Sequence, residues 1–396
     1  MGLSETIQQG TTRDVSVVPL SSRGETFTSY DVDAFEIPSS HDEAWRFTPL
    51  RRLKGLHDGT AKATGIVTVT ADAPAGITVE SVNRDDPRLG AAGVPADRVA
   101  AQAWTSFTEA TVVSVAANTE VDEPVTLTMT GPGVGQVAYG HTQVRLEPFA
   151  RAVVVIDQRG SGTFAENLEL VVGDSAHLTV VTVQDWADDA VHVASHHALL
   201  GRDAVLRHSA ISLGGDLVRL TPTVHYGAPG GDAQMLGVYF ADAGQHLEQR
   251  LFVDHSQPHC RSDVMYKGAL QGEPGSGVPD AHTVWIGDVL IRAGADGTET
   301  FELNRNLILT DGARADSVPN LEIETGEIAG AGHASATGRF DDEQLFYLRS
   351  RGITEEQARR LVVRGFFHEV LAKITVVPIR ERLEASIEAE LAAVGV

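Results

Sequence analysis

Few residues of this chain have the types and spacings that catalysis or metal binding needs. Cys260 is the only cysteine, which excludes an intramolecular disulfide, a four-thiolate zinc site and a self-sufficient iron–sulfur site. None of the four lysines follows a glycine, so the sequence has no Gly-Lys-Ser/Thr phosphate loop. His368-Glu369 begins a His-Glu-x-x-His zinc motif, but Ala372 stands where the second histidine belongs. We therefore expect any ATP hydrolysis that serves this protein to come from another chain.

A group of histidines and aspartates in the middle of the chain has the composition of a metal site. Its members are Asp185, Asp188, Asp189, His192, His196 and His197. The four-residue interval between two of the histidines suits a helix, whereas the surrounding residues are typical of strand and loop. We therefore favour a solvated acidic loop over a metal site.

Cys260 and His255 also have plain structural interpretations. His259 and Arg261 flank the thiol and could lower its pKa, but a lone cysteine is more often a small buried hydrophobic residue. His255 falls in a strand-like stretch, where a histidine is usually a hydrogen-bonded core residue. We expect both residues to be structural.

The composition excludes several classes of protein. The chain has 396 residues, which predicts two to three domains at roughly 150 residues each. The 31 basic and 54 acidic residues give a net charge of −23, which disfavours binding to nucleic acid. No apolar run reaches the ~18 residues of a membrane helix, and the N-terminus lacks the features of a secretory signal. We expect a cytoplasmic protein without membrane contact.

The hydrophobic pattern of residues 111–328 predicts a mainly β core. Alternating β-branched stretches recur there, and a turn motif places small residues 26, 28, 29 and 29 positions apart, at Ala150, Ala176, Ala204, Ala233 and Ser262. A motif repeated at about 20–50 residues is the signature of stacked repeats, and these repeats contain strands but no helix. We expect a β-solenoid. A β-sandwich or a double-stranded barrel is the alternative, because these folds also have many short strands.

Residues 1–110 predict a small N-terminal α/β region with short helices. Ser40, with Glu43 three residues later, has the spacing of a capping box for a short helix that carries Trp45. Residues 64–92 are strand-like, and residues 95–109 predict a second helix.

Residues 329–396 predict a C-terminal helical domain. Asp341-Asp342 opens a first helix, Thr354 and Gln357 form a capping box for a second, and a third follows Pro378. The predicted apolar face of the second helix consists of Ala358, Leu361, Val362, Phe366, Val370 and Leu371. This domain is too small to bury its apolar residues alone, so we expect it to dock on another surface.

The sequence GAGHASATGRFDDEQLFYLRSRGITEEQARRLVVRGFFHEVL resembles the C-terminal signature of the SufB/SufD family of iron–sulfur cluster assembly proteins. The segments DEAWRFTPL, GQHLEQRLFVDHSQPHCRSDVMYKGAL and FELNRNLILTDGARADSVPNLEIETGEI match the same family in the right order. Because the chain lacks the long N-terminal region and the cysteines expected of SufB, it is similar to the SufD members. The resemblance implies a small N-terminal domain, a right-handed parallel β-helix and a C-terminal helical domain.

The resemblance also implies partners and a site. A SufD subunit pairs with SufB through the β-helices, recruits the SufC ATPase through its C-terminal helices, and receives sulfur indirectly from a cysteine desulfurase and a sulfur carrier. The nascent iron–sulfur cluster is placed at the SufB interface, with a SufB cysteine and a SufD histidine as ligands. That histidine corresponds to His333. Many SufD proteins have Cys-Ser-His where this chain has Ala331-Gly332-His333.

We interpret His333 as a ligand of iron or of the cluster, held in a turn of small residues that leaves the solenoid; the alternative is a turn histidine bonded to its own backbone. For the isolated chain we expect no stably bound cofactor, and the resemblance leaves a homodimer open. The residues that we expect to contact a partner are Tyr347, Arg349, Arg351, Gly352, Phe366 and Glu369.

The sequence therefore predicts a non-catalytic scaffold subunit for iron–sulfur cluster assembly. The alternative is a free-standing β-helix enzyme or binding protein that acts on polysaccharide, but the net charge and the absence of a signal sequence disfavour it. A cupin-like metalloenzyme would need a compact set of histidines and glutamates on adjacent strands, and the sequence does not provide one.

Overall fold

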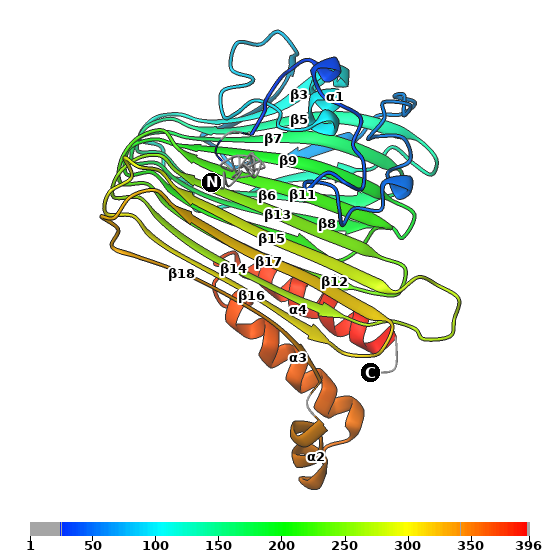
Figure 1. The fold of residues 1–396 in the computed structure, drawn as a ribbon. Helices are drawn as coiled ribbons and strands as arrows, with labels where there is room; N and C mark the ends of the chain where they lie inside the picture. The colour runs from blue at the N-terminus through cyan, green and yellow to red at the C-terminus, as the bar shows by residue number, and fades with distance from the viewer. Residues whose placement is uncertain (1–23, 25, 341, 394–396) are drawn as a thin grey trace, which may run out of the picture.

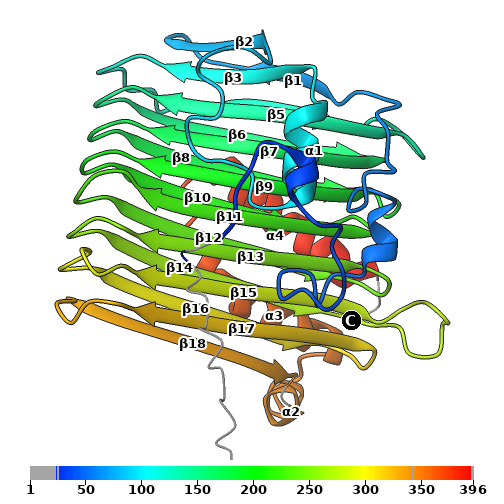
Figure 2. The same cartoon turned by 45° about the horizontal axis from the view of Figure 1, so that its top comes forward.

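The protein is a two-sheet β-solenoid with a helical C-terminus, as predicted (Figure 1, Figure 2). Its structure, a computed structural model, describes residue 24, residues 26–340 and residues 342–393. Each coil of the chain contributes one strand to sheet A and one to sheet B, and the coils stack so that each sheet has nine strands. Neighbouring strands are parallel, except for the antiparallel pairs β1–β4 and β2–β3 at the N-terminal end.

From β3 onward, consecutive strands of the chain alternate between the two sheets. Sheet A consists, in spatial order, of β1 (Thr68–Asp72), β4 (Val125–Thr130), β6 (Arg151–Gly160), β8 (His177–Trp186), β10 (Val205–Ser212), β12 (Asp232–Ala241), β14 (Arg261–Leu270), β16 (Glu299–Ile308) and β18 (Gly330–Arg339). Sheet B consists of β2 (Ile77–Asn83), β3 (Glu109–Val115), β5 (Val137–Leu146), β7 (Thr163–Val172), β9 (Val191–Leu200), β11 (Leu217–Tyr226), β13 (His246–His255), β15 (Ala281–Ile291) and β17 (Ala313–Ile323). The sheets therefore extend beyond residues 111–328 in both directions.

The turn that precedes each strand of sheet A repeats from coil to coil. Ala150, Ala176 and Ala204 occupy equivalent places in it, and the carbonyl of each accepts a hydrogen bond of 2.8–2.9 Å from the next coil. The following equivalents are Gly231 and Cys260, not the predicted Ala233 and Ser262, which are the second residues of their strands. The turn requires a small residue between coils, and glycine and cysteine also satisfy that requirement.

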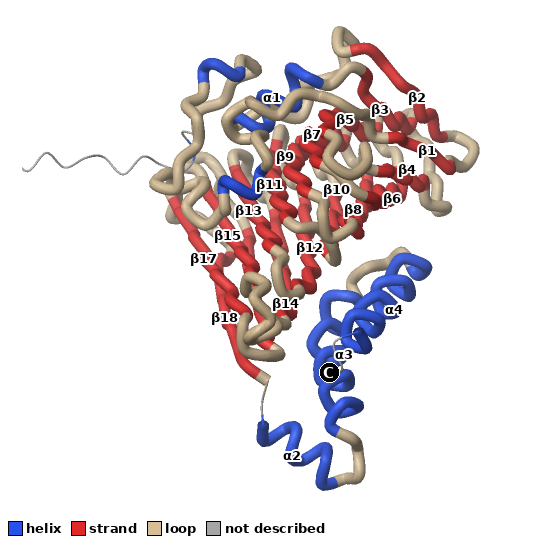
Figure 3. The backbone as a smooth tube through the Cα atoms, turned by 90° about the vertical axis from the view of Figure 1, so that its right-hand side faces the viewer, coloured by secondary structure: helices blue, strands red, loops and turns tan. Residues whose placement is uncertain are grey.

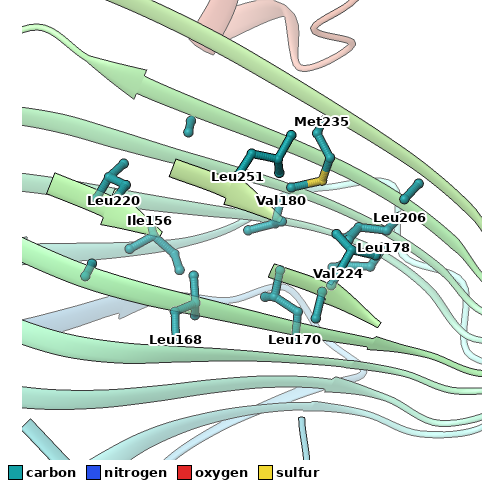
Figure 4. Close-up of a cluster of buried hydrophobic side chains, with 14 of the residues drawn as sticks. Ile156, Leu168, Leu170, Leu178, Val180, Leu206, Leu220, Val224, Met235 and Leu251 are labelled. Carbon is teal, nitrogen blue, oxygen red and sulfur yellow. The ribbon is translucent and has the colours of Figure 1, made fainter. Parts of the chain in front are cut away.

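Alternate side chains of each strand fill the space between the two sheets. Figure 4 shows part of this core, in which aliphatic side chains from successive coils pack against one another. Labelled in that view are Ile156, Leu168, Leu170, Leu178, Val180, Leu206, Leu220, Val224, Met235 and Leu251. Burial of such side chains, at roughly 25 cal/mol per Å² of apolar surface, is the main stabilising term of the solenoid.

The N-terminal segment covers the outer face of sheet B. Trp45 is 3% exposed, and the Arg219 guanidinium lies 3.9 Å from the centroid of its ring system. Thr48 donates a hydrogen bond of 2.7 Å to the carboxylate of Glu248. The prediction of a helix after Ser40 is wrong. The chain forms turns there, and Trp45 packs on the sheet.

Three short helical elements support this cover. Two 3₁₀ helices span Val32–Ala34 and Leu50–Leu53. The helix α1 (Arg98–Ser106) confirms the one predicted over 95–109, and Asp97 caps it by accepting a hydrogen bond from the Ala100 amide.

Two of the three C-terminal helices cover the outer face of sheet A. These helices are α2 (Asp342–Ser350), α3 (Glu355–Leu371) and α4 (Val377–Ala393), and the capping box of Thr354 and Gln357 is present at the start of α3. Residues of α3 and α4 join a buried apolar cluster on sheet A (Figure 3). The expected docking surface is therefore the solenoid itself. Within the described residues, no helix is long and apolar enough to cross a lipid bilayer.

The predicted apolar face of α3 is confirmed at Ala358, Val370 and Leu371, which are buried, but in the middle of the helix the buried face is displaced by one residue. Val363 and Phe367 are fully buried against sheet A, whereas Phe366 is half-buried and Leu361 is 48% exposed. The doublets Val362-Val363 and Phe366-Phe367 make both phases of the helix equally apolar. The sheet decides which phase is buried.

Phe367→Ala is expected to lower the free energy of unfolding by about 3–5 kcal/mol, because it opens a cavity between α3 and sheet A. Phe366→Ala is the matched control and should cost about 1 kcal/mol, since its ring is half solvated. Urea unfolding of both variants measures the difference. Equal losses would contradict the observed phase of α3.

The buried Glu248 carboxylate makes the N-terminal cover sensitive to acid. Burial by itself raises the pKa of Glu248, but the hydrogen bond from His246 and the charges of Arg219 and Arg250 outweigh it and lower the pKa to about 2. Because the folded pKa lies below that of the unfolded chain, this carboxylate stabilises the protein above about pH 4.5, and the contribution disappears as the pH falls toward 2.

We expect Glu248→Gln to be less stable than wild type by about 3 kcal/mol at pH 6, with the difference shrinking steadily below pH 4. Urea unfolding from pH 6 to pH 3 measures this. A difference that does not change with pH would show that the charge of Glu248 has no stabilising role.

Candidate functional site

His333 lies in β18, the last strand of sheet A, in register with Glu302 of β16. The prediction that His333 sits in a turn leaving the solenoid is wrong. Its small neighbours favour a turn in the sequence, but backbone pairing with β16 needs no side chains and makes the segment a strand. Among the described residues, no hydrogen bond reaches the ring of His333, and the side chain is exposed.

The strands β17 and β18 end the two sheets and leave the interior of the last coil open. In the described part of the chain each has a paired strand on one side only, and Figure 2 shows them together at one end of the stack. Ala331 packs against the interior core, so strand alternation places His333 and Ser335 on the same inner face. His333 therefore points from the end of the solenoid interior toward solvent.

A connected set of polar side chains lies inside the last coils. Asn304 donates to the Tyr239 hydroxyl at 2.9 Å and accepts from Asn306 at 2.8 Å. Its side-chain oxygen also accepts a hydrogen bond of 2.7 Å from Ser317, and Ser335 contacts Ser317 at 2.7 Å. The interior is therefore polar at this end, and its hydrogen bonds continue to exposed Ser335.

Glu302 is one of the interior groups of these coils that have no hydrogen-bond partner among the described residues, and the hydroxyls of Tyr266 and Thr283 are others. Glu302 is 3% exposed, and neither carboxylate oxygen has a hydrogen-bond partner among the described residues. Burial, together with the nearby charge of Asp288, raises the pKa of Glu302 to about 8. Gly287 lies opposite, where an added Cβ would come within 2.8 Å of Glu302 Oε1. The indole nitrogen of Trp285 is also buried without a partner.

Nothing in our sequence analysis singled out Glu302. It alternates with Phe301 and Leu303 in the run Thr300–Asn306, and such alternation normally marks the polar residues as the solvent side. Here the polar residues face the interior and Phe301 is 46% exposed. The alternation of polar and apolar residues is visible in the sequence, but the tertiary structure decides which of the two sets faces the interior.

The helix α2 presents the predicted aromatic and arginine residues. Phe346 and Tyr347 are 74% and 55% exposed, and the Arg351 guanidinium lies 5.0 Å from the centroid of the Tyr347 ring. Arg349 pairs with Glu355 at 3.2 Å. Gly352 ends the helix with φ of +86°, a conformation that favours glycine. Figure 1 and Figure 3 show α2 projecting beyond the two sheets.

Phe366 and Glu369, the other predicted contact residues, bind the solenoid instead of projecting from it. Lys267 of β14 donates to the Phe366 carbonyl and to the Glu369 carboxylate, both at 2.7 Å. The Lys267 side chain is 3% exposed, whereas that of Glu369 is 50% exposed. These contacts attach α3 to sheet A and leave part of Glu369 accessible.

The other candidate groups are structural. His192, His196 and His197 are buried residues of β9, so the predicted solvated loop is wrong for the histidines. Strand pairing buries them, and no group of three or more metal-ligating residues occurs in the described part of the chain. His255 is buried and contacts Ser262 at 2.9 Å.

Cys260 is 1% exposed and lies in the interior core. Burial raises the pKa of its thiol, which makes it unreactive. Its interpretation as a small buried residue is confirmed.

Comparison with known proteins decides the family. The sequence-family model described as SUF system FeS cluster assembly, SufBD core domain, matches residues 127–366. The chain belongs to the SufBD family. An iron–sulfur cluster assembly SufBD family protein of Mycobacterium tuberculosis is 67% identical over 369 residues, which cover 93% of each chain. A SufBD family protein of Synechocystis is 22% identical over 414 residues, covering 88% of this chain and 86% of the relative.

Membership in the SufBD family assigns the chain to Suf iron–sulfur cluster assembly and removes the support for a polysaccharide-binding β-helix. The M. tuberculosis strain with the 67% identical relative has a second SufBD family protein. This second protein is 25% identical to the present chain over 207 residues, and the match covers 52% of the present chain and 24% of the relative. Two members of the family therefore occur in one organism.

Asn304→Ala is expected to lower the free energy of unfolding by about 2 kcal/mol or more, because it removes the buried hydrogen bonds that Asn304 makes with Tyr239, Asn306 and Ser317 inside the last coils. Ser335→Ala removes one exposed hydrogen bond from the same network and should cost less than about 0.5 kcal/mol. Urea unfolding compares the two variants. Equal effects would show that the network adds nothing beyond its exposed end.

Proposed function

We propose that this SufBD family protein is a non-catalytic scaffold subunit with the role of SufD. It pairs with SufB through the open end of the solenoid, supplies His333 to an iron–sulfur cluster that forms at the interface, and recruits the SufC ATPase through its C-terminal helices. Sulfur reaches the complex indirectly, from a cysteine desulfurase through a sulfur carrier.

The observation that carries this proposal is the open end itself. Within the described residues, β17 and β18 each have one strand edge without a paired strand, and such an edge can bind another chain. His333 lies in β18 and its side chain is exposed. A neutral imidazole is a competent iron ligand. The second SufBD family protein in M. tuberculosis supports pairing between two members of the family.

The exposed surface of α2 supports recruitment of an ATPase. Tyr347 and Arg351 stack on each other, and exposed aromatic and arginine side chains are the types that dominate interface energetics. α3 and α4 use their buried faces to cover sheet A, whereas α2 exposes Phe346 and Tyr347 and projects from the solenoid (Figure 3). The sequence has no Gly-Lys-Ser/Thr phosphate loop, which fits a division of labour with a separate ATPase subunit.

The proposal predicts that partner capture and cluster formation separate by mutation. In the co-expressed three-protein complex, Tyr347→Ala with Arg351→Ala should weaken capture of SufC by about 30-fold, since loss of an interface anchor costs about 2 kcal/mol or more. Pairing with SufB should persist. His333→Ala should leave the complex assembled but reduce anaerobic cluster reconstitution.

The control for the histidine is His177→Ala, an exposed histidine on the outer face of sheet A. Pull-down with tagged SufC and the rise of the cluster absorbance measure the two functions. Reconstitution at the wild-type rate with His333→Ala would remove the ligand role of His333. Unchanged SufC capture by the double variant would place the ATPase elsewhere.

A further inference from the structure

The unpartnered carboxylate of Glu302 lies one coil below His333. Both residues are on the inner face of sheet A, at directly paired positions of β16 and β18. Neighbouring strands lie about 4.8 Å apart, so side chains at paired positions of the same face lie side by side. This places a carboxylate and an imidazole next to each other at the open end of the solenoid.

We propose that Glu302 and His333 together bind one ferrous ion at this end. The inference rests on the proposed function for the identity of the metal and extends it to a residue inside the solenoid. A carboxylate and an imidazole form a ligand pair suited to divalent iron. Two protein ligands leave coordination positions for ligands from a partner chain or for sulfide.

The surroundings of Glu302 support a ligand rather than a core residue. Buried polar side chains are nearly always hydrogen-bonded, and the neighbouring interior residues Asn304 and Asn306 are. Neither oxygen of Glu302 has a hydrogen-bond partner in the described part of the chain, although the side chain is almost fully buried. Gly287 on the opposite sheet has no Cβ, and the Trp285 ring packs into that position beside Glu302.

The exposure of the two residues suggests how the ion would be held. His333 is exposed and Glu302 is covered by the last coil. An ion bound between them would have solvent and the partner chain on one side and the closed interior on the other. The site would therefore be accessible from the same end through which the chain is proposed to pair.

Equilibrium dialysis of the full chain against Co²⁺ under anaerobic conditions tests the pair. Co²⁺ is an oxidation-resistant probe with the charge and ligand preferences of Fe²⁺. The variants are Glu302→Gln, which keeps the shape of the side chain, His333→Ala, and the double variant. Glu299→Gln is the matched control, because Glu299 lies on the same strand but pairs with Arg261 on the outer face.

We expect the wild-type protein to bind one Co²⁺, and Glu302→Gln and His333→Ala each to lower the affinity at least tenfold. The double variant should lower the affinity no more than the stronger of the two single changes. Glu299→Gln should bind as wild type does. The inference is overturned if Glu302→Gln binds Co²⁺ as tightly as the wild-type protein does. It is also overturned if the wild-type protein binds no more Co²⁺ than the double variant at concentrations up to about 1 mM, a range that includes weak sites.

Cluster reconstitution in the complex separates this inference from the proposed function. If Glu302→Gln binds Co²⁺ normally while His333→Ala still blocks cluster formation, the pair is wrong and the scaffold role stands. If both single variants lose Co²⁺ but His333→Ala complexes form clusters at the wild-type rate, the metal site is real and the proposed role of His333 in cluster formation is wrong.

Discussion

The register of the stacked coils determines where every other part of this molecule can lie. Parallel pairing places each residue of a strand beside one defined residue of the next coil, on the same face of the sheet. A shift by one residue would turn every interior side chain to the outside. The register is fixed by the turn that precedes each strand of sheet A, where a small residue fits between coils and its carbonyl accepts a hydrogen bond from the coil above. It is this register that brings His333 over Glu302.

The outer faces of the two sheets explain the placement of the two termini. A parallel sheet is stable when both of its faces are covered, and this chain covers each face with a different terminus. The N-terminal segment packs on sheet B around Trp45 and Arg219, and α3 and α4 pack on sheet A around Phe367. The open end at β17 and β18 and the projecting helix α2 are two regions of the described structure that this packing leaves uncovered.

The interior of the solenoid contains buried polar side chains as well as an aliphatic core. The middle coils combine aliphatic side chains with a hydrogen-bonded row of Gln158, Gln184 and Ser212 (Figure 4). In the last coils Asn304 and Asn306 form hydrogen bonds with Tyr239, and Ser317 donates to Asn304. A polar interior costs desolvation unless every group is bonded. Glu302 is the group in this region whose carboxylate stays without a partner. Such a residue is most easily understood at a site that receives a ligand.

Local patterns along the chain were enough to establish the mainly β class, the coil repeat, the helical C-terminus with its capping box and the family signature. These features depend on short-range spacing: turn residues at intervals of one coil, alternation along strands and the 3.6-residue period of a helix. The run of aromatic and arginine residues identified Tyr347 and Arg351 as residues of interest. His333 was identified by the resemblance to the SufB/SufD family, whose motifs are contiguous in the chain. The structure added their exposure.

Long-range packing selected which of two equivalent patterns is realised. The doublets Val362-Val363 and Phe366-Phe367 allow two phases of α3, and contact with sheet A selects Val363 and Phe367. The alternation around Glu302 is the same whether the polar or the apolar residues face inward, and stacking against β14 turned the polar ones in. The turn-like sequence around His333 became a strand because β16 offered a free edge. In each case the deciding contact is with residues far away in the chain. Local spacing in the sequence therefore cannot predict which side chains are buried.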